Sequence, residues 1–89
     1  MSEKKKKLCV DTEPEKCFWV CDGSVLKNLC ELAAALETMN EPTFKYHVNK
    51  EKNDFANWVR DVFGDQKLAK GLMKAKTAKA TAKQVRARI

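Results

Sequence analysis

The middle of the chain carries a block of large apolar side chains at the spacing of an α-helix. Five residues recur at positions i, i+3, i+4, i+7 and i+8, namely Phe55, Trp58, Val59, Val62 and Phe63. They share one broad face, which has to be buried against other elements. Asn53 or Asp54 can cap the start of this helix, and Gly64 suits the position just beyond its end. The chain is therefore predicted to fold as packed helices.

A strand and a second helix are predicted upstream of this block. Residues 17–21 are strand formers, and Asp22-Gly23 is typical of a turn. Ser24 can then act as an N-cap for four apolar residues at helical spacing, Val25, Leu29, Leu32 and Leu36. This pattern predicts one N-terminal strand, followed by a helix that ends near Met39.

The rest of the chain is expected to form short helices. Asn40 can cap a segment that contains Phe44, and Asp65 can cap a helix beginning near Leu68. Thr77 either starts a separate helix or lies inside a longer one. The predicted fold is a small, mainly α single domain of four to five short helices with one N-terminal strand. The predicted core consists of Phe18, Val20, Leu29, Leu32, Leu36, Phe44, Phe55, Trp58, Val59, Val62, Leu68 and Leu72.

Charge is distributed very unevenly around the formal net charge of +6. Residues 1–7 carry four lysines and one acid, residues 8–65 six basic residues and eleven acids, and residues 66–89 eight basic residues and no acid. The three segments therefore carry +3, −5 and +8. We expect a charged, disordered arm (1–15), a compact helical domain (16–76) and a basic Ala/Lys-rich C-terminal helix or tail (77–89).

The sequence argues against a membrane protein. Its longest apolar runs, 17–21 and 32–36, have five residues each, whereas a membrane-spanning helix needs about 20. Only three apolar residues separate the Lys4–Lys7 cluster from the acids that follow, so no secretory leader is expected. We expect a cytoplasmic or nucleoid-associated protein without a membrane partner.

The four cysteines do not have the spacing of a metal site. Cys17 and Cys21 lie in the predicted strand, where about 3.3 Å per residue would put their Cα atoms about 13 Å apart. That separation is too large for a disulfide or a shared zinc ion. Cys30 has no second cysteine nearby in the sequence. We expect reduced cysteines that act as small buried apolar residues, with no cofactor and no metal; a cysteine-ligated zinc module is the minor alternative.

Two segments carry a resemblance to a known family. The first runs from Phe44 through His47-Val48-Asn49, and the second from Asn53-Asp54-Phe55 through Trp58. Together they resemble a family of small, mainly archaeal domains of unknown function that has an H-V-N motif and an N-D-F-x-x-W motif. The resemblance covers residues 17–77 and implies a compact, mostly helical module.

The sequence contains few residues that could form a catalytic site. His47 is the only histidine, and no nucleophile elbow, phosphate-binding glycine loop or His-x-x-x-His pair is present. We expect a non-enzymatic protein in which His47 packs under Phe44 and Trp58 and bonds to the backbone. The alternative is that Tyr46, His47 and Asn49 form an exposed recognition corner.

The acid-free end points to a polyanion as partner. Eight like charges repel one another unless an anion neutralises them. The leading prediction is sequence-nonspecific binding to the DNA or RNA backbone through Lys74, Lys76, Lys79, Lys83, Arg86 and Arg88. The alternatives are a solvated tail, or a protein-interaction module near Trp19 and Tyr46 that binds a protein partner or another copy of the chain.

Overall fold

The computed structural model of the protein describes residues 9–89, so the Lys4–Lys7 cluster lies outside the described residues. This part of the chain is mainly α, as predicted, with five α-helices and a two-stranded antiparallel sheet. The elements are the 3₁₀ turn η1 (Pro14–Lys16), β1 (Phe18–Trp19), β2 (Val25–Leu26), α2 (Leu29–Thr38), α3 (Glu41–His47), α4 (Asp54–Trp58), the π-helical turn η2 (Val59–Phe63), α5 (Gln66–Lys74) and α6 (Ala78–Arg88).

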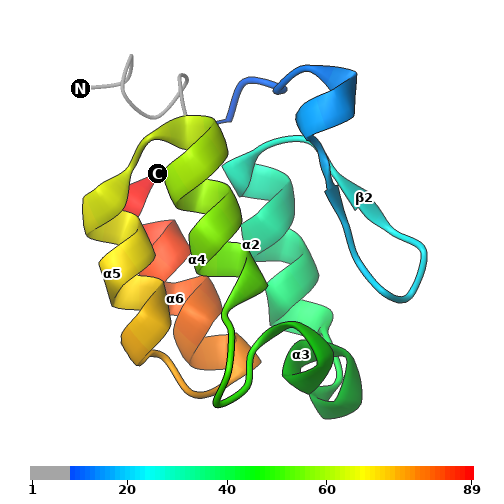
Figure 1. Cartoon of the computed structure of the whole chain (residues 1–89), viewed down its shortest axis with the longest axis vertical. Helices are drawn as coiled ribbons and strands as arrows, with labels where there is room; N and C mark the ends of the chain where they lie inside the picture. The colour runs from blue at the N-terminus through cyan, green and yellow to red at the C-terminus, as the bar shows by residue number, and fades with distance from the viewer. Residues whose placement is uncertain (1–8) are drawn as a thin grey trace.

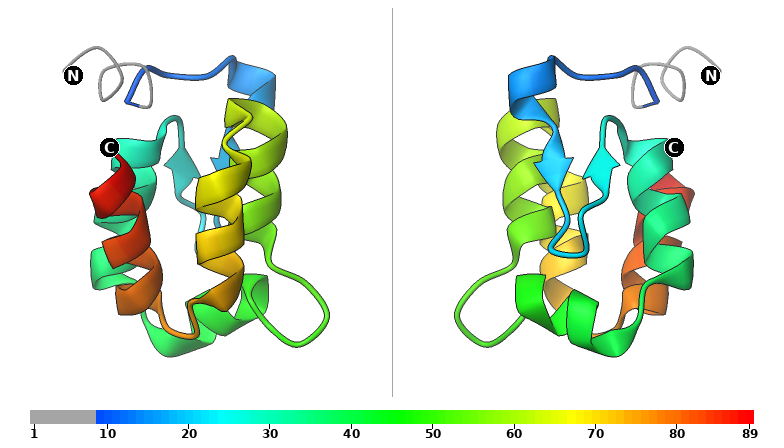
Figure 2. Two further views of the ribbon diagram at one scale, coloured as in Figure 1. Left: turned by 90° about the vertical axis from the view of Figure 1, so that its left-hand side faces the viewer. Right: turned by 90° about the vertical axis from the view of Figure 1, so that its right-hand side faces the viewer.

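Four helical segments pack lengthwise and enclose the core (Figure 1). The α6 helix lies between α2 and α5, and α4 with η2 packs against α5. The α3 helix crosses one end of this bundle, and the β-hairpin covers the opening between α4 and α2 (Figure 2). The end of the molecule where α3, the α3–α4 loop and the α5–α6 turn meet carries the candidate site described below.

The core matches the prediction at every residue except Val62, which is only partly buried. Phe55, Leu32 and Leu72 are fully buried, so helices from three parts of the chain meet at one centre. The core also includes Val85 of α6, which the sequence does not identify because its neighbours are mostly alanine and lysine.

The N-terminal apolar segment is one half of a β-hairpin. Phe18 of β1 faces Leu26 of β2, and Trp19 faces Val25. Gly23 has a φ of 99° in the connecting turn, a conformation that glycine adopts without strain. The predicted helix start at Val25 is therefore wrong. The turn returns the chain alongside β1 at once, so these residues pair as a second strand.

The helix begins later, at Leu29, because Asn28 and not Ser24 is its N-cap. Asn28 Oδ1 accepts the Glu31 N–H at 2.8 Å, and Glu31 Oε1 accepts the Lys27 N–H at 2.8 Å. Side chains thus satisfy one backbone donor of the first turn and one donor just before the cap, an arrangement similar to a capping box.

The other four α-helices begin at the caps that the sequence predicts. Each cap side chain accepts the backbone N–H of the residue three positions on at 3.0 Å; the caps are Asn40, Asn53, Asp65 and Thr77. Thr77 therefore starts a separate helix. Gly64 ends η2 with a φ of 68°, the left-handed conformation common at helix C-termini.

Residues 9–15, which the sequence places in the arm, lie against the body. The Thr12 N–H donates to the Lys27 carbonyl at 2.8 Å, and Asn28 Nδ2 donates to Asp11 Oδ1 at 2.7 Å. These contacts join part of the segment assigned to the arm to the rest of the protein. The other residues assigned to the arm, 1–8, lie outside the described residues.

The expectation of four reduced, buried cysteines is wrong. Cys9 and Cys30 form a disulfide with their Cα atoms 5.1 Å apart, whereas Cys17 is half-buried and Cys21 is exposed. The physical reason is the hairpin, which brings the segment before η1 alongside the start of α2. Sequence spacing alone could not reveal this, because 21 residues separate the two partners.

The basic C-terminal segment is a helix that belongs to the core. Val85 and Thr81 of α6 are fully buried, and Ala82 is nearly so. Both α2 and α5 pack against α6. The basic residues from position 66 onward therefore lie on α5 and α6, on the surface of the body itself.

Candidate functional site

Four of the six predicted phosphate-contacting residues lie close together in the chain, around the α5–α6 turn. Lys74 is the last residue of α5, Lys76 lies in the turn, and Lys79 and Lys83 are one helical turn apart on α6. All four side chains are exposed, and none of them forms an ion pair with a carboxylate of residues 9–89. Their ammonium groups are available to an external anion.

The two predicted arginines are engaged within the protein. Arg86 binds Glu37 of α2 through Nε at 2.8 Å and Nη2 at 3.0 Å. Arg88 binds Asp65 through Nε at 2.7 Å and Nη2 at 3.3 Å. These hydrogen bonds raise the pKa of both guanidinium groups, and the Arg86 pair lowers the pKa of the Glu37 carboxyl. The arginines thus fasten α6 to α2 and to the start of α5.

Three adjoining depressions surround the α5–α6 turn. The first, of about 410 Å³, lies between the α3–α4 loop and the end of α5, and Lys76 forms part of its wall. Lys76 and Lys79 also line the second, of about 270 Å³, which lies between α3 and the start of α6. Lys79 and Lys83 line the third, of about 460 Å³, between α6 and α2. Neighbouring depressions share a lining residue, which is Lys76 for the first and second and Lys79 for the second and third.

We call the lysines that line these depressions the lysine path. It consists of Lys45, Lys50, Lys52, Lys76, Lys79 and Lys83. Two of them are paired: Lys45 Nζ lies 3.3 Å from Glu41, and Lys52 Nζ lies 3.0 Å from Asp54. The other four form no ion pair within residues 9–89.

Three glutamates line the same depressions. Glu37 is paired with Arg86 and Glu41 with Lys45. Within residues 9–89, Glu51 is the one glutamate on the path without an ion pair. The unpaired charge along the path is therefore strongly positive, four lysines against one glutamate.

His47 lies beneath this end of the molecule and is buried, with 4% of its surface exposed. Its Nε2 accepts the Cys21 N–H at 3.0 Å, and its Nδ1 lies 3.0 Å from Asp54 Oδ2. An amide N–H can only donate, so Nε2 carries the lone pair and the Nδ1 proton points at Asp54. The ring packs against Phe18 and Phe55, and not under Phe44 and Trp58 as the sequence suggested.

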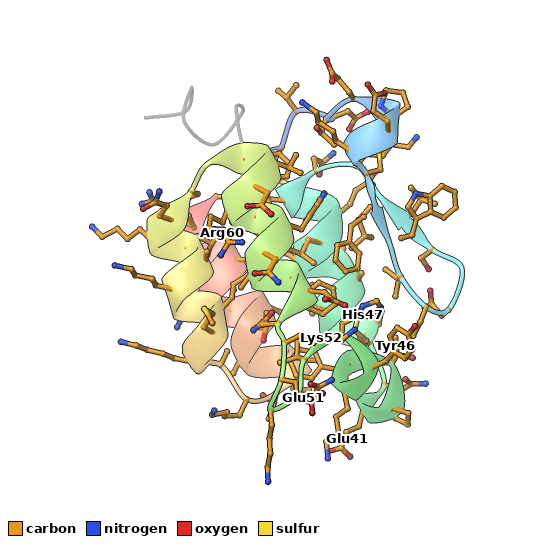
Figure 3. The ribbon with its side chains drawn as sticks, in the orientation of Figure 1. Glu41, Tyr46, His47, Glu51, Lys52 and Arg60 are labelled. Carbon is orange, nitrogen blue, oxygen red and sulfur yellow. A yellow bond between two sulfur atoms is a disulfide. The ribbon has the colours of Figure 1, made fainter. Side chains whose placement is uncertain are left out.

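The three residues of the predicted recognition corner lie in different environments. Tyr46 is 59% exposed, and Lys52 Nζ lies 5.0 Å from the centre of its ring. Figure 3 shows Tyr46 and His47 on α3, with Lys52 and Glu51 on the loop that follows. Asn49 is exposed, but its Oδ1 accepts the Glu51 N–H at 3.0 Å and so shapes that loop. Of these three, only Tyr46 presents an exposed side chain that has no hydrogen bond within residues 9–89.

The residues of the H-V-N and N-D-F-x-x-W segments form one structural unit. Val48 and Asn53 pair across the α3–α4 loop, and Asn53 Nδ2 donates to the Leu72 carbonyl at 3.1 Å. Trp58 Nε1 donates to the Lys16 carbonyl at 2.7 Å. The segments thus join α3, α4, α5 and η1. These contacts give the polar residues of both segments a structural role, so a catalytic role is not needed to explain them.

Residues 9–89 contain no group of three or more His, Cys, Asp or Glu side chains that could hold a metal ion. None of the helices in this part of the chain is both long enough and apolar enough to cross a membrane.

Sequence reasoning missed three members of the lysine path. Lys45, Lys50 and Lys52 lie at or near the α3–α4 loop, more than 20 positions before Lys76. Charge counting places all three in the acidic segment 8–65. Only the fold brings them beside the α5–α6 turn.

The chain was compared with known proteins. A model described as "Family of unknown function (DUF5752)" matches residues 15–89, so the chain belongs to that family. No curated protein and no solved structure matches it.

Proposed function

We propose that this member of the DUF5752 family is a non-enzymatic protein that binds the phosphate backbone of nucleic acids without reading their sequence. The observation that carries the proposal is the run of unpaired, exposed lysines around the α5–α6 turn. Lys76, Lys79 and Lys83 of this run are the principal phosphate contacts, with Lys74 beside them.

Unpaired lysines on one course suit a linear polyanion better than a single small anion. Each ammonium that neutralises a phosphate releases condensed counterions, which drives binding at low salt. Like charges held this close repel one another in the free protein, and an anionic backbone relieves that repulsion. The same residues also support solubility, but solubility does not require them to line adjoining depressions.

The chemistry of the path favours backbone contact over base reading. Bidentate recognition of guanine uses arginine or lysine, and recognition of adenine uses asparagine or glutamine. Arg86 and Arg88 are held by Glu37 and Asp65, and the side chain of Asn49 shapes its own loop. We therefore assign Arg86 and Arg88 an indirect role, which is to position α6 and its lysines.

The test is a titration of duplex DNA, duplex RNA and single strands of each with the whole protein, at several salt concentrations. The expected result is binding that weakens steeply as salt rises, with little difference between sequences. Absence of binding to all four at low salt, or an affinity that does not change with salt, would contradict the proposal.

A matched pair of variants separates the effect of the path lysines on affinity from the effect of net charge alone. The first replaces Lys76, Lys79 and Lys83 with alanine. The control replaces Lys16, Lys27 and Arg60 with alanine, so it removes the same charge from exposed positions off the path. The first variant should lose affinity and the control should keep most of it.

One observation favours a second candidate function, protein interaction. Trp19 is 69% exposed on the outer side of the hairpin, and exposed tryptophan is enriched at interfaces. Self-association through this residue would appear as a dimer in sedimentation, and Trp19→Ser should abolish it. A monomer at all protein concentrations, at low and high salt, would count against self-association.

A further inference from the structure

We infer that the nucleic acid bound by the lysine path is single-stranded, and that Tyr46 provides a stacking platform for its bases. This inference rests on the proposed function and narrows its substrate class. Two independent observations carry it: the course that the path takes around α6, and the exposed aromatic ring at one end of that course.

The lysine path turns around the start of α6. The first depression lies at the α5 side of this helix, and the third lies at its α2 side. Because α6 lies between α2 and α5 (Figure 1), a ligand that touches both depressions has to bend around the α5–α6 turn. Lys76 and Lys79 lie at this bend, where the second depression joins the other two.

Because the protein is small, this bend strongly restricts which nucleic acids can follow the path. Its principal dimensions are 34, 25 and 22 Å, whereas duplex DNA is stiff over about 50 nm. A duplex could therefore touch one side of the turn at a time, leaving the other lysines without phosphates. A single strand is flexible enough to follow the whole course, and proteins that bind single strands commonly use a positively charged groove for the backbone.

Tyr46 has the properties of a stacking residue. Its ring is largely exposed, and no hydrogen bond to its hydroxyl is present within residues 9–89. Lys52 connects this ring to the path, because its ammonium lies 5.0 Å from the ring centre and its side chain lines the first depression. Because this ammonium lies over the ring, a base that stacks on the same face has to displace it, and the displaced Lys52 can then meet a phosphate.

One neighbour of the Tyr46 ring is held rigidly. The Tyr46 ring meets the buried His47 ring edge-on at 4.9 Å between centres. His47 is in turn held by the Cys21 N–H and by Asp54, so the support does not depend on the ligand. Stacking of this kind tolerates any base, which agrees with binding that does not read sequence.

The experiment compares three probes with the unmodified protein at one low salt concentration. The probes are a mixed-sequence single strand, the same strand annealed to its complement, and inorganic polyphosphate with the same number of charges. The single strand should bind most tightly, because it alone combines flexibility with exposed bases. Equal or tighter binding of the duplex would overturn the inference.

Tyr46→Ala and Tyr46→Phe test the platform. Tyr46→Ala should weaken binding of the single strand about tenfold, within the range that stacking on one aromatic side chain supports. It should leave polyphosphate binding unchanged, and Tyr46→Phe should keep most of the affinity. An unchanged affinity of Tyr46→Ala for the single strand would overturn the role of Tyr46.

These outcomes are distinguishable from a failure of the proposed function. If the protein binds the duplex and polyphosphate in a salt-dependent manner without preferring the single strand, backbone binding stands and the further inference fails. If none of the three probes binds at low salt, the proposed function itself fails.

Discussion

Individual polar residues carry much of the local geometry in this protein, and most of them act on the backbone. Every α-helix begins at a side chain that accepts an N–H of its first turn. Each such cap contributes about 1 kcal/mol to stability. This is why residue-level reasoning located four of the five helix starts. It failed at Ser24, where a cap residue and a turn residue look the same in sequence.

His47 is expected to be a structural residue whose two ring nitrogens are both needed. His47→Phe fits an aromatic side chain beside Phe18 and Phe55 but removes the acceptor of the Cys21 N–H, whereas Asp54 loses His47 and keeps its ion pair with Lys52. Unsatisfied buried groups cost about 1–3 kcal/mol. Urea denaturation should show this loss of unfolding free energy, with Tyr46→Phe as the neutral control. Parental stability of His47→Phe would contradict the assignment.

Asp65 should show two separable contributions. Its Oδ1 caps α5 by accepting the Leu68 N–H, and the carboxylate also binds Arg88. Asp65→Asn keeps the cap but loses the charge that pairs with Arg88. Arg88→Gln likewise removes the ion pair and keeps the cap, whereas Asp65→Ala loses both. We expect the alanine variant to be less stable than the asparagine variant by about 1 kcal/mol in thermal denaturation. Equal stabilities would rule out a role as cap.

At the scale of elements, periodicity identified the helices. It did not reveal the pairing of the second strand or the burial of α6. The strand at Phe18 was predicted, but its partner at Val25 was hidden because Val25 also fits the helical stripe of Leu29 and Leu32. The C-terminal segment was expected to be a basic Ala/Lys-rich helix or tail, and it forms the helix α6. Its burial could not be predicted, because small side chains give a weak apolar signal and tertiary contacts decide where they pack.

The α6 helix is expected to be necessary for folding. Removing residues 77–89 would take Thr81, Ala82 and Val85 out of the core and expose the surfaces of α2 and α5 that they cover. A chain ending at residue 76 should therefore lack a cooperative thermal transition in circular dichroism. A sharp transition near the parental temperature would show that residues 16–76 fold without this helix.

The ion pair between Glu37 and Arg86 joins α2 to α6 and makes stability depend on pH. The hydrogen bond from Arg86 holds the pKa of the Glu37 carboxyl below its usual value. A pKa depressed by folding stabilises the protein above the unfolded-state pKa, and this contribution is lost as pH falls through the folded-state value. Glu37→Gln should lower the melting temperature slightly at neutral pH and match the parent in acid. A difference that persists in acid would contradict this.

At the scale of the whole molecule, the strongly charged segment of the sequence forms part of the surface of the folded domain. The +8 segment is not an extension of the body. Its two arginines pair with carboxylates at the surface of the protein, and its lysines join three others from the α3–α4 region. Charge counting suggests a polyanion as partner, which stays a prediction, and it names three lysines of the path, Lys76, Lys79 and Lys83. It could not predict the lysine path, because residues far apart in sequence meet only after folding.

The central claim is that Lys76, Lys79 and Lys83 contact phosphates directly. The most direct test is the slope of log affinity against log salt for a single strand, measured for the parent and for the variant with these three residues replaced by alanine. Each lost phosphate contact lowers the magnitude of the slope by about 0.7, so the variant should show a slope smaller by about 2. An unchanged slope, or an equal reduction in the variant of Lys16, Lys27 and Arg60, would contradict the claim.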